Sequence, residues 1–305
     1  MSDNLISVIT ATYNRSKILY YSILSVIYQT YNNWELIVVG DCCTDDTEEV
    51  VKSFNNPKIK FVNLESNFGE QSYPNNVGMK LANGGFIAFL NHDDIWFPDH
   101  LETSYNTLIE KDADITFSLI CQIGNFGESS ILNTTISGKY EPGMLIPATS
   151  WLLKKNVINR IGFWNSAFEL RTSPSDDYMY RAYKNNLNIV STKKLTVVKI
   201  SSLKTKKSYL TEDTLNQEIY NKIIENKNFR EELLTEIVNG SFNDYFIKIH
   251  IFKLTRELIR KFSLFASKFL KINPSYIINF VAYGFRKGSL INYLRKKRGL
   301  TKIKR

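Results

Sequence analysis

Histidine and cysteine are scarce in this chain, with three of each among 305 residues. Cys42 and Cys43 are adjacent and Cys121 lies far away, so their spacing fits neither a disulfide framework nor a zinc site. We therefore expect three reduced thiols and no metal held by sulfur.

Long apolar runs are also missing. The longest late run, residues 276–283, is far shorter than the ~20 apolar residues that cross a bilayer. The first residues lack the basic and apolar regions of a signal peptide. These features predict a cytoplasmic protein. A hydrophobic content of 43% is enough for a large core, which excludes disordered and collagen-like proteins.

The net charge of +9 is divided unevenly along the chain. Residues 241–305 contain 16 Lys and Arg against 2 acidic residues, whereas residues 1–240 contain 23 against 28. The body is therefore acidic and the tail strongly basic.

Strand-length and helix-length patterns alternate in the first half. The apolar strand-like runs are 5–11, 34–39, 59–64 and 86–90, and the helical segments are 16–30, 44–54 and 73–82. This alternation predicts an α/β fold, a mostly parallel sheet with helices on both faces. Ligands of such sheets bind beyond the carboxyl ends of the strands. After residue 114 we predict a strand at 150–153, a helix at 174–184, and a Gly- and Asn-rich loop at 124–143 near an acceptor.

Two adjacent carboxylates end the fourth strand, in Phe89-Leu-Asn-His-Asp-Asp-Ile-Trp. Carboxylate oxygens suit Mg²⁺ or Mn²⁺, and a metal at Asp93 would bridge a departing diphosphate. The alternative is that Asp94 caps the next helix and Asp93 is solvated, and the motif alone leaves both open. Asp41 follows the second strand, where it fits either a base or ribose contact or a turn.

Five motifs in order resemble glycosyltransferase family 2, over about residues 5–200. They are Val8-Ile-Thr-Ala-Thr-Tyr-Asn-Arg, Val39-Gly-Asp-Cys-Cys-Thr-Asp-Asp-Thr, Asn67-Phe-Gly through Asn76-Val-Gly to Ala82-Asn-Gly-Gly-Phe-Ile-Ala-Phe-Leu-Asn-His-Asp-Asp, Ile161-Gly-Phe-Trp-Asn, and Ser175-Asp-Asp-Tyr-Met-Tyr-Arg. The resemblance implies a GT-A fold and inverting sugar transfer from a nucleotide sugar, most often a uridine one. It implies a catalytic domain at 1–205, with a nucleotide-sugar half at 1–112 and an acceptor half at 113–205, followed by a helical basic extension at 206–305.

The resemblance also implies roles for individual residues. Asp177 stands at the catalytic base and Asp93 at the metal ligand, with Mg²⁺ or Mn²⁺ as cofactor. The nucleotide-sugar contacts would come from Thr10, Ala11, Tyr13, Arg15, Asp41, Asn67, Asn76, Asn91 and His92. Secondary candidates are Asp94, Asp176, Arg181 and Lys199. Ser173 to Asp176 reads as a capping box, so we assign capping to Asp176 and chemistry to Asp177, one helical turn from Arg181.

Four departures from the family pattern limit this transfer. Asn91 replaces an Asp of the metal-binding triplet, Asn75 replaces an Arg that faces the phosphates, and Asp176 replaces a Glu. No His follows the late strand, where Lys199 would neutralise phosphate instead.

The spacing of apolar and basic residues at 242–270 predicts one amphipathic basic helix. Asn273-Pro274 predicts the start of a further helix that runs into Arg295-Lys-Lys-Arg. Aromatic residues opposite basic ones favour attachment to the anionic inner face of a membrane. The alternative is an apolar stripe that packs on the catalytic domain. No nucleic-acid-binding motif accompanies the charge.

Three function classes follow. A glycosyltransferase of cell-surface polysaccharide synthesis, acting on a glycan or lipid-linked saccharide, is our main interpretation. A nucleotidyltransferase would need a Gly-rich phosphate loop that is missing after Ala11. A membrane-associated scaffold with a decayed site would fit Asn75 and Asn91, but Asp93 and Asp177 are both retained.

Overall fold

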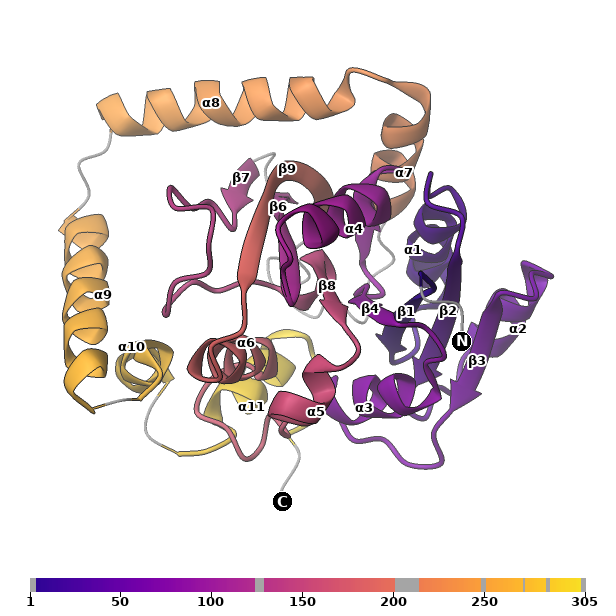
Figure 1. Cartoon of the computed structure of the whole chain (residues 1–305), viewed down its shortest axis with the longest axis horizontal. Coiled ribbons are helices and arrows are strands. Elements are labelled where there is room, and N and C mark those ends of the chain that lie inside the picture. Colours follow the sequence, from indigo (N-terminus) through magenta and orange to yellow (C-terminus); the bar gives the residue numbers. More distant parts are fainter. Residues whose placement is uncertain are drawn as a thin grey trace.

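A mixed, curled sheet forms the centre of the molecule (Figure 1). The computed structural model describes residues 4–123, 129–200, 214–247, 251–270, 272–283 and 286–302. Within these residues the sheet has nine strands, in the order β3-β2-β1-β4-β8-β6-β9-β5, with β7 paired to β6.

The first four strands confirm the predicted parallel arrangement. They are β1 (Ile6–Thr12), β2 (Trp34–Gly40), β3 (Ile59–Asn63) and β4 (Phe86–Phe89). All neighbouring pairs among them are parallel, so their carboxyl ends meet at one edge. Because both faces of the inner strands are covered, their sequences are nearly continuous apolar runs.

The second half of the sheet is mixed rather than parallel. Its strands are β5 (Asp94–Trp96), β6 (Ile115–Ile123), β7 (Ser129–Leu132), β8 (Trp151–Lys154) and β9 (Ile189–Ile200). Only β6 and β9 pair in parallel there. The predicted loop at 124–143 contains β7, which pairs with the end of β6, and residues 124–128 lie outside the described residues.

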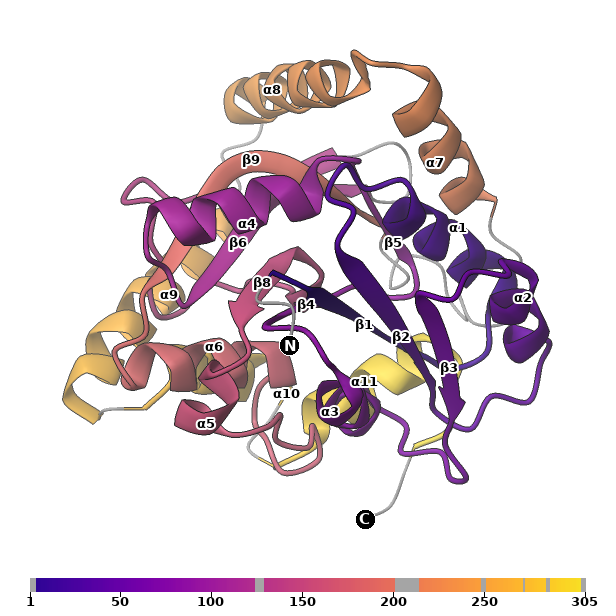
Figure 2. The same ribbon diagram turned by 45° about the vertical axis from the view of Figure 1, so that its right-hand side comes forward.

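Six helices cover the two faces of the sheet and bury separate apolar cores (Figure 2). They are α1 (Ser16–Ile27), α2 (Thr47–Ser53), α3 (Ser72–Leu81), α4 (His100–Glu110), α5 (Val157–Ile161) and α6 (Pro174–Lys184); a short 3₁₀ turn spans Ala148–Ser150. Alternate residues of β1 point to opposite cores, Val8 with α1, α2 and α4, and Ile9 with α3, α5 and α6.

The C-terminal region is helical, as predicted, but its helices are shorter. They are α7 (Leu215–Glu225), α8 (Phe229–Ile247), α9 (Ile251–Leu270), α10 (Pro274–Tyr283) and α11 (Ser289–Lys297). The prediction of one helix over 242–270 was wrong, since α8 ends at Ile247 and α9 follows a different side of the molecule (Figure 1). Helical periodicity did not reveal the two separate helices, because it reports apolar spacing and not the direction of the helix axis.

The predicted helix from Asn273 to Arg295 is also interrupted. Asn273 does cap α10, accepting a hydrogen bond from the Ser275 amide at 2.9 Å, but α10 ends at Tyr283. Gly288, with a left-handed φ of 75°, precedes α11 and donates its amide to Leu170 O at 3.0 Å. A Cβ there would lie 3.3 Å from the Phe168 carbonyl oxygen, and the left-handed φ would strain any other residue, so glycine suits this position.

None of the described helices combines the length and apolarity needed to span a bilayer. The division into domains at residue 205 falls in 201–213, outside the described residues, and stays a prediction.

Candidate active site

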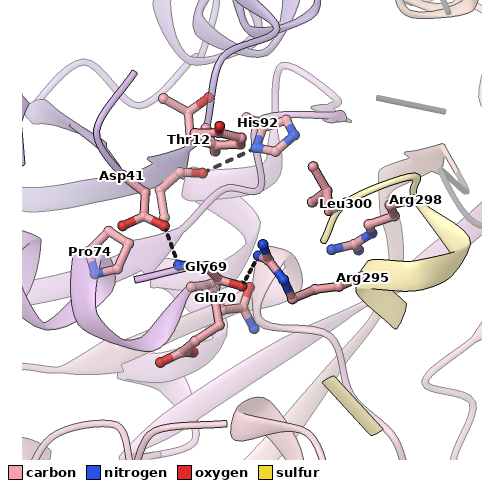
Figure 3. A pocket seen from close by; sticks show the side chains of 12 residues that line it. Thr12, Asp41, Gly69, Glu70, Pro74, His92, Arg295, Arg298 and Leu300 are labelled. Atoms are coloured by element: carbon pink, nitrogen blue, oxygen red, sulfur yellow. Dashed lines mark hydrogen bonds between the residues drawn. The ribbon is translucent and has the colours of Figure 1, made fainter. Parts of the chain in front are cut away.

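A cavity of about 480 Å³ opens at the carboxyl ends of β1 and β2 (Figure 3). It is lined by Ala11, Thr12, Tyr13, Asp41, Gly69, Glu70, Gln71, Pro74, His92, Arg295, Arg298 and Leu300. It lies where parallel sheets bind ligands. Of the predicted nucleotide contacts, Ala11, Tyr13, Asp41 and His92 meet here.

Asp41 organises one wall of this cavity. Its two carboxylate oxygens accept hydrogen bonds from the amides of Phe68 and Gly69, both at 2.8 Å. Asn67 donates to Asp41 O at 3.0 Å. The Asp therefore fixes the loop that follows β3 against the end of β2, and Asn67 supports this loop without lining the cavity.

The turn after β1 holds an uncommon backbone conformation. Asn14 and Arg15 have left-handed φ values of 55° and 67°. Residues in such conformations often cluster at functional sites. The turn brings Arg15 Nη1 to 4.0 Å from Asp93 Oδ2, whereas Thr10 stays buried within β1 and takes no part in the cavity wall.

The next feature is the His92-Asp93 pair at the end of β4. His92 Nδ1 lies 3.3 Å from Ala11 O, a contact in which the ring nitrogen donates. Burial lowers the pKa of His92 to about 4, so its ring is neutral at pH 7. Burial alone would raise the pKa of Asp93, but its neighbours lower it. These neighbours are, in order of effect, His92, Lys199, Arg15 and Arg298. Because His92 is neutral at pH 7, the positive charge beside the ionised Asp93 carboxylate comes from the lysine and the two arginines.

Asp94 begins strand β5 and does not cap a helix, which corrects one alternative from the sequence. Its pairing with β9 sets it opposite Lys199, whose Nζ lies 3.5 Å from Asp94 Oδ2. Asn91 Nδ2 donates to the same oxygen at 2.8 Å. Burial raises the pKa of Asp94 to about 6. Lys199 and Asn91 thus stabilise the buried Asp94 carboxylate, next to Asp93 in the sequence.

A second cavity, of about 540 Å³, adjoins the first and shares Gly69, Glu70, Gln71 and Arg298 with it. Thr172, Ser173 and Pro174, at the start of α6, line its far side.

Asp177 lies in the first turn of α6, three residues beyond Pro174, and 6% of its surface is exposed. Its Oδ2 accepts hydrogen bonds from Arg181 Nε and Asn165 Nδ2, both at 2.9 Å. Arg181 thus orients Asp177, as the helical spacing suggested. Neither cavity wall includes the Asp177 side chain.

The capping assignment holds for Ser173 but not for the Asp176 side chain. Ser173 Oγ accepts from the Asp176 amide at 3.2 Å, whereas the Asp176 carboxylate accepts from Thr172 Oγ1 at 2.6 Å and Asn273 Nδ2 at 3.0 Å. Burial raises the pKa of Asp176 to about 6. Asp176 therefore anchors the C-terminal helices to α6.

Asn76 has a structural partner rather than a place in either cavity wall. Its side chain exchanges two hydrogen bonds with the backbone of Trp164, both at 2.9 Å. It joins α3 to the Ile161-Gly-Phe-Trp motif.

The sequence did not single out four residues of the cavities: Glu70, Gln71, Arg295 and Arg298. Glu70 and Gln71 directly follow the Asn67-Phe-Gly motif, so that motif was the available signal for them. Burial raises the pKa of Glu70. The two arginines are more than 200 residues away in sequence and carried no signal for this site.

The residues at Asp93 fit a cation held jointly with substrate. Among the described residues, no three His, Cys, Asp or Glu side chains cluster as a metal site of the protein alone. Mg²⁺ usually binds through one or two carboxylates plus phosphates and water. A single ionised carboxylate at Asp93 meets that requirement.

Comparison with solved structures agrees with this architecture. The crystal structure of S. aureus TarS 1–349 in complex with UDP-GlcNAc aligns with a TM-score of 0.55 at 19% identity, over 96% of this chain and 87% of that chain. The fold is therefore the GT-A fold, with a C-terminal helical extension. Fold and cavity together define a protein of the GT-A class.

The family follows from the sequence model for glycosyl transferase family 2, which matches residues 7–164, just over half of the chain. The chain belongs to this family, and the predicted resemblance is confirmed.

Among curated relatives, the Escherichia coli UDP-Glc:alpha-D-GlcNAc-diphosphoundecaprenol beta-1,3-glucosyltransferase WfgD is 36% identical over 140 residues, 46% of this chain and 52% of that protein. The putative teichuronic acid biosynthesis glycosyltransferase TuaG of Bacillus subtilis is 34% identical over 125 residues, 39% of this chain and 49% of that protein. The chain thus spans about half the length of these two relatives.

Proposed function

We propose that this protein is an inverting glycosyltransferase that moves a sugar from a nucleotide sugar, with UDP as the nucleotide, to a glycan or lipid-linked saccharide in cell-surface polysaccharide synthesis. The observation that carries the proposal is the cavity at the ends of β1 and β2, lined by Tyr13, Asp41 and His92. The names of WfgD and TuaG support the sugar-transfer class and the surface-polysaccharide setting.

In this proposal Asp177 is the general base. The acceptor hydroxyl gives its proton to the Asp177 carboxylate while its oxygen bonds to the anomeric carbon. The bond from that carbon to the diphosphate oxygen breaks, and its electron pair leaves with the diphosphate. Arg181 and Asn165, both bonded to one carboxylate oxygen, support this role because they fix the carboxylate and leave its other oxygen for the proton.

The same proposal includes Mg²⁺ or Mn²⁺ at Asp93. The cation would neutralise charge on the departing diphosphate, so the protein needs no acid to protonate the leaving group. The ionised state of Asp93 and its place beside the cavity residue His92 support this assignment.

A donor panel tests the proposed function. We expect one nucleotide sugar among the UDP, GDP, dTDP and CMP series to raise the melting temperature, with UDP sugars the strongest and the shift larger with Mn²⁺, because bound ligand stabilises the folded state. The measurement is a thermal-shift assay at equal donor concentrations, with free sugars as controls. The absence of any donor-dependent shift would favour a decayed, non-catalytic protein.

We further propose that α9 attaches the protein to an anionic membrane surface. Among its described side chains, Leu258, Phe262 and Phe265 are 59%, 64% and 62% exposed at helical spacing. More than half of each of these side chains is exposed, which supports membrane attachment over the alternative of a covered stripe. The basic character of residues 241–305 complements an anionic lipid surface.

Replacing Phe262 and Phe265 together by serine is expected to reduce co-sedimentation with anionic liposomes at least about fivefold, because both rings lose apolar burial in the interface. Ile109→Ser, which removes an exposed apolar side chain from α4, is the matched control and should bind like the wild type. Equal binding by both variants would contradict an α9 attachment, as would binding to neutral liposomes at the same strength.

A further inference from the structure

The C-terminal helix α11 and the turn after it close one side of the donor cavity. Arg295, Arg298 and Leu300 form this wall, opposite Asp41 and His92 (Figure 3). The sequence predicted a membrane role for the whole Arg295-Lys-Lys-Arg cluster. Lys296 and Lys297 are indeed exposed, but Arg295 is buried and Arg298 lies at the cavity.

We propose that α11 supplies the phosphate-binding wall of the donor site, with Arg298 as the residue that contacts the diphosphate. This inference rests on the proposed function, since it assigns a part of the nucleotide-sugar site to the C-terminal extension. It concerns a residue that lies outside the matched family segment 7–164.

The wall is held in place by specific contacts. Arg295 Nη1 donates to Gly69 O at 2.7 Å, and its Nε donates to Thr301 O at 2.8 Å. One side chain thus ties α11 and the turn beyond it to the loop that Asp41 organises. The Gly288 amide bonds to Leu170 O before α11 begins, and Asn273 bonds to Asp176 before α10 begins. The contacts with Gly69, Leu170 and Asp176 join the extension to the catalytic body.

Arg298 has the position that a diphosphate contact requires. Arg298 lines both cavities, and so do Gly69 and Glu70. A donor whose nucleotide occupies the first cavity would therefore have its diphosphate near Arg298, where the two cavities adjoin. The charge of Arg298 also acts on Asp93 and His92, which places it in the same electrostatic environment as the carboxylate proposed for the cation. A planar guanidinium matches phosphate oxygens in a two-point hydrogen-bonded geometry.

Two other cations near the cavity face carboxylates. Lys199 pairs with Asp94 at 3.5 Å, and Arg15 Nη1 lies 4.0 Å from Asp93. Asn75, at the position where the family often has an Arg toward the phosphates, brings no charge. Arg298 from the far end of the chain supplies a positive charge in the donor cavity itself.

The test compares binding of UDP and uridine, which differ by the diphosphate, in wild type, Arg298→Ala, Arg298→Lys and Lys297→Ala. Lys297→Ala is the matched control, because this substitution removes one positive charge from an exposed position next to Arg298. UDP affinity is measured by calorimetry in EDTA and again with Mn²⁺, and uridine affinity by ligand-observed NMR. Melting temperatures of all variants check that they fold. If the donor panel selects a nucleotide with another base, the diphosphate and nucleoside of that base replace UDP and uridine.

We expect Arg298→Ala to weaken UDP binding about tenfold or more in EDTA, and uridine binding less than about twofold, because only the charged hydrogen bonds are lost. Arg298→Lys should recover part of the UDP affinity, and Lys297→Ala should match the wild type. Equal losses for UDP and uridine, or UDP binding unchanged in Arg298→Ala, would overturn the inference and leave the proposed function standing. Failure of wild type to bind any nucleotide would overturn both.

Discussion

Replacing Asp93 with alanine is expected to reduce sugar transfer by roughly 100-fold to 1000-fold and to remove the Mn²⁺-dependent part of donor binding. The fall follows from the several kcal/mol that a cation contributes to charge on a leaving diphosphate, at about 1.4 kcal/mol for each tenfold change in rate. Initial rates of transfer measured across a Mn²⁺ titration, together with donor thermal shifts, check both parts of the expectation.

Asp94→Asn is the matched control for this variant. The two carboxylates are adjacent, but Asp94 is fully buried and paired with Lys199 and Asn91. We expect Asp94→Asn to change stability while Mn²⁺ dependence remains. If Asp93→Ala kept the Mn²⁺ response and Asp94→Asn lost it, the cation would belong to Asp94. If both variants behaved like wild type, the metal proposal would be wrong.

The second large effect is expected for Asp177→Asn, which should reduce kcat about 100-fold to 10,000-fold, the usual contribution of a general base. The amide keeps the size of the carboxylate and an oxygen for Arg181 and Asn165, but it does not accept the acceptor's proton. Donor affinity should stay within about twofold, because this interaction acts on the transition state and not on the bound donor. Steady-state transfer rates and donor titrations separate the two quantities.

Asp176→Asn provides the comparison for that result, since it changes the preceding carboxylate in the same helical turn. Asp176 bonds to Thr172 and Asn273 and holds α10 against α6. Its replacement should leave kcat within about tenfold, since it has no part in proton transfer. If Asp176→Asn reduced kcat more than Asp177→Asn did, Asp176 would be the general base and Asp177 the structural residue.

The sequence predicted the nucleotide half of the fold closely. β1, β2, β3 and β4 begin and end within one residue of their predicted bounds, and α6 matches its prediction. These elements are specified locally, by apolar runs, fully buried in β2 and β4, and by a Ser-Pro cap before α6. The predictions weakened after residue 114, where β6, β8 and β9 pair in mixed directions, because strand partners depend on distant segments.

Of the predicted site residues, some line the cavity and others have structural partners elsewhere. Ala11, Tyr13, Asp41 and His92 were predicted from the family resemblance, and the structure brings them together because they lie near the carboxyl ends of parallel strands. Asn76, Asn67 and Asp176 have other partners, with Trp164, Asp41 and Asn273 respectively. Residue type and motif position did not reveal which hydrogen-bond partner each polar side chain would meet.

By itself, therefore, the sequence determined the class of fold, the family and the edge of the sheet that carries the cavity, because strand runs, caps and motif spacing are local properties of the chain. Only the tertiary structure decided that the basic tail is divided between two surfaces. It exposes Phe262 and Phe265 on α9, and it buries Arg295 on α11 and brings Arg298, at the end of this helix, to the cavity beside β1 and β2. That outcome depends on contacts such as Arg295 with Gly69, between residues 226 positions apart, which no local pattern encodes.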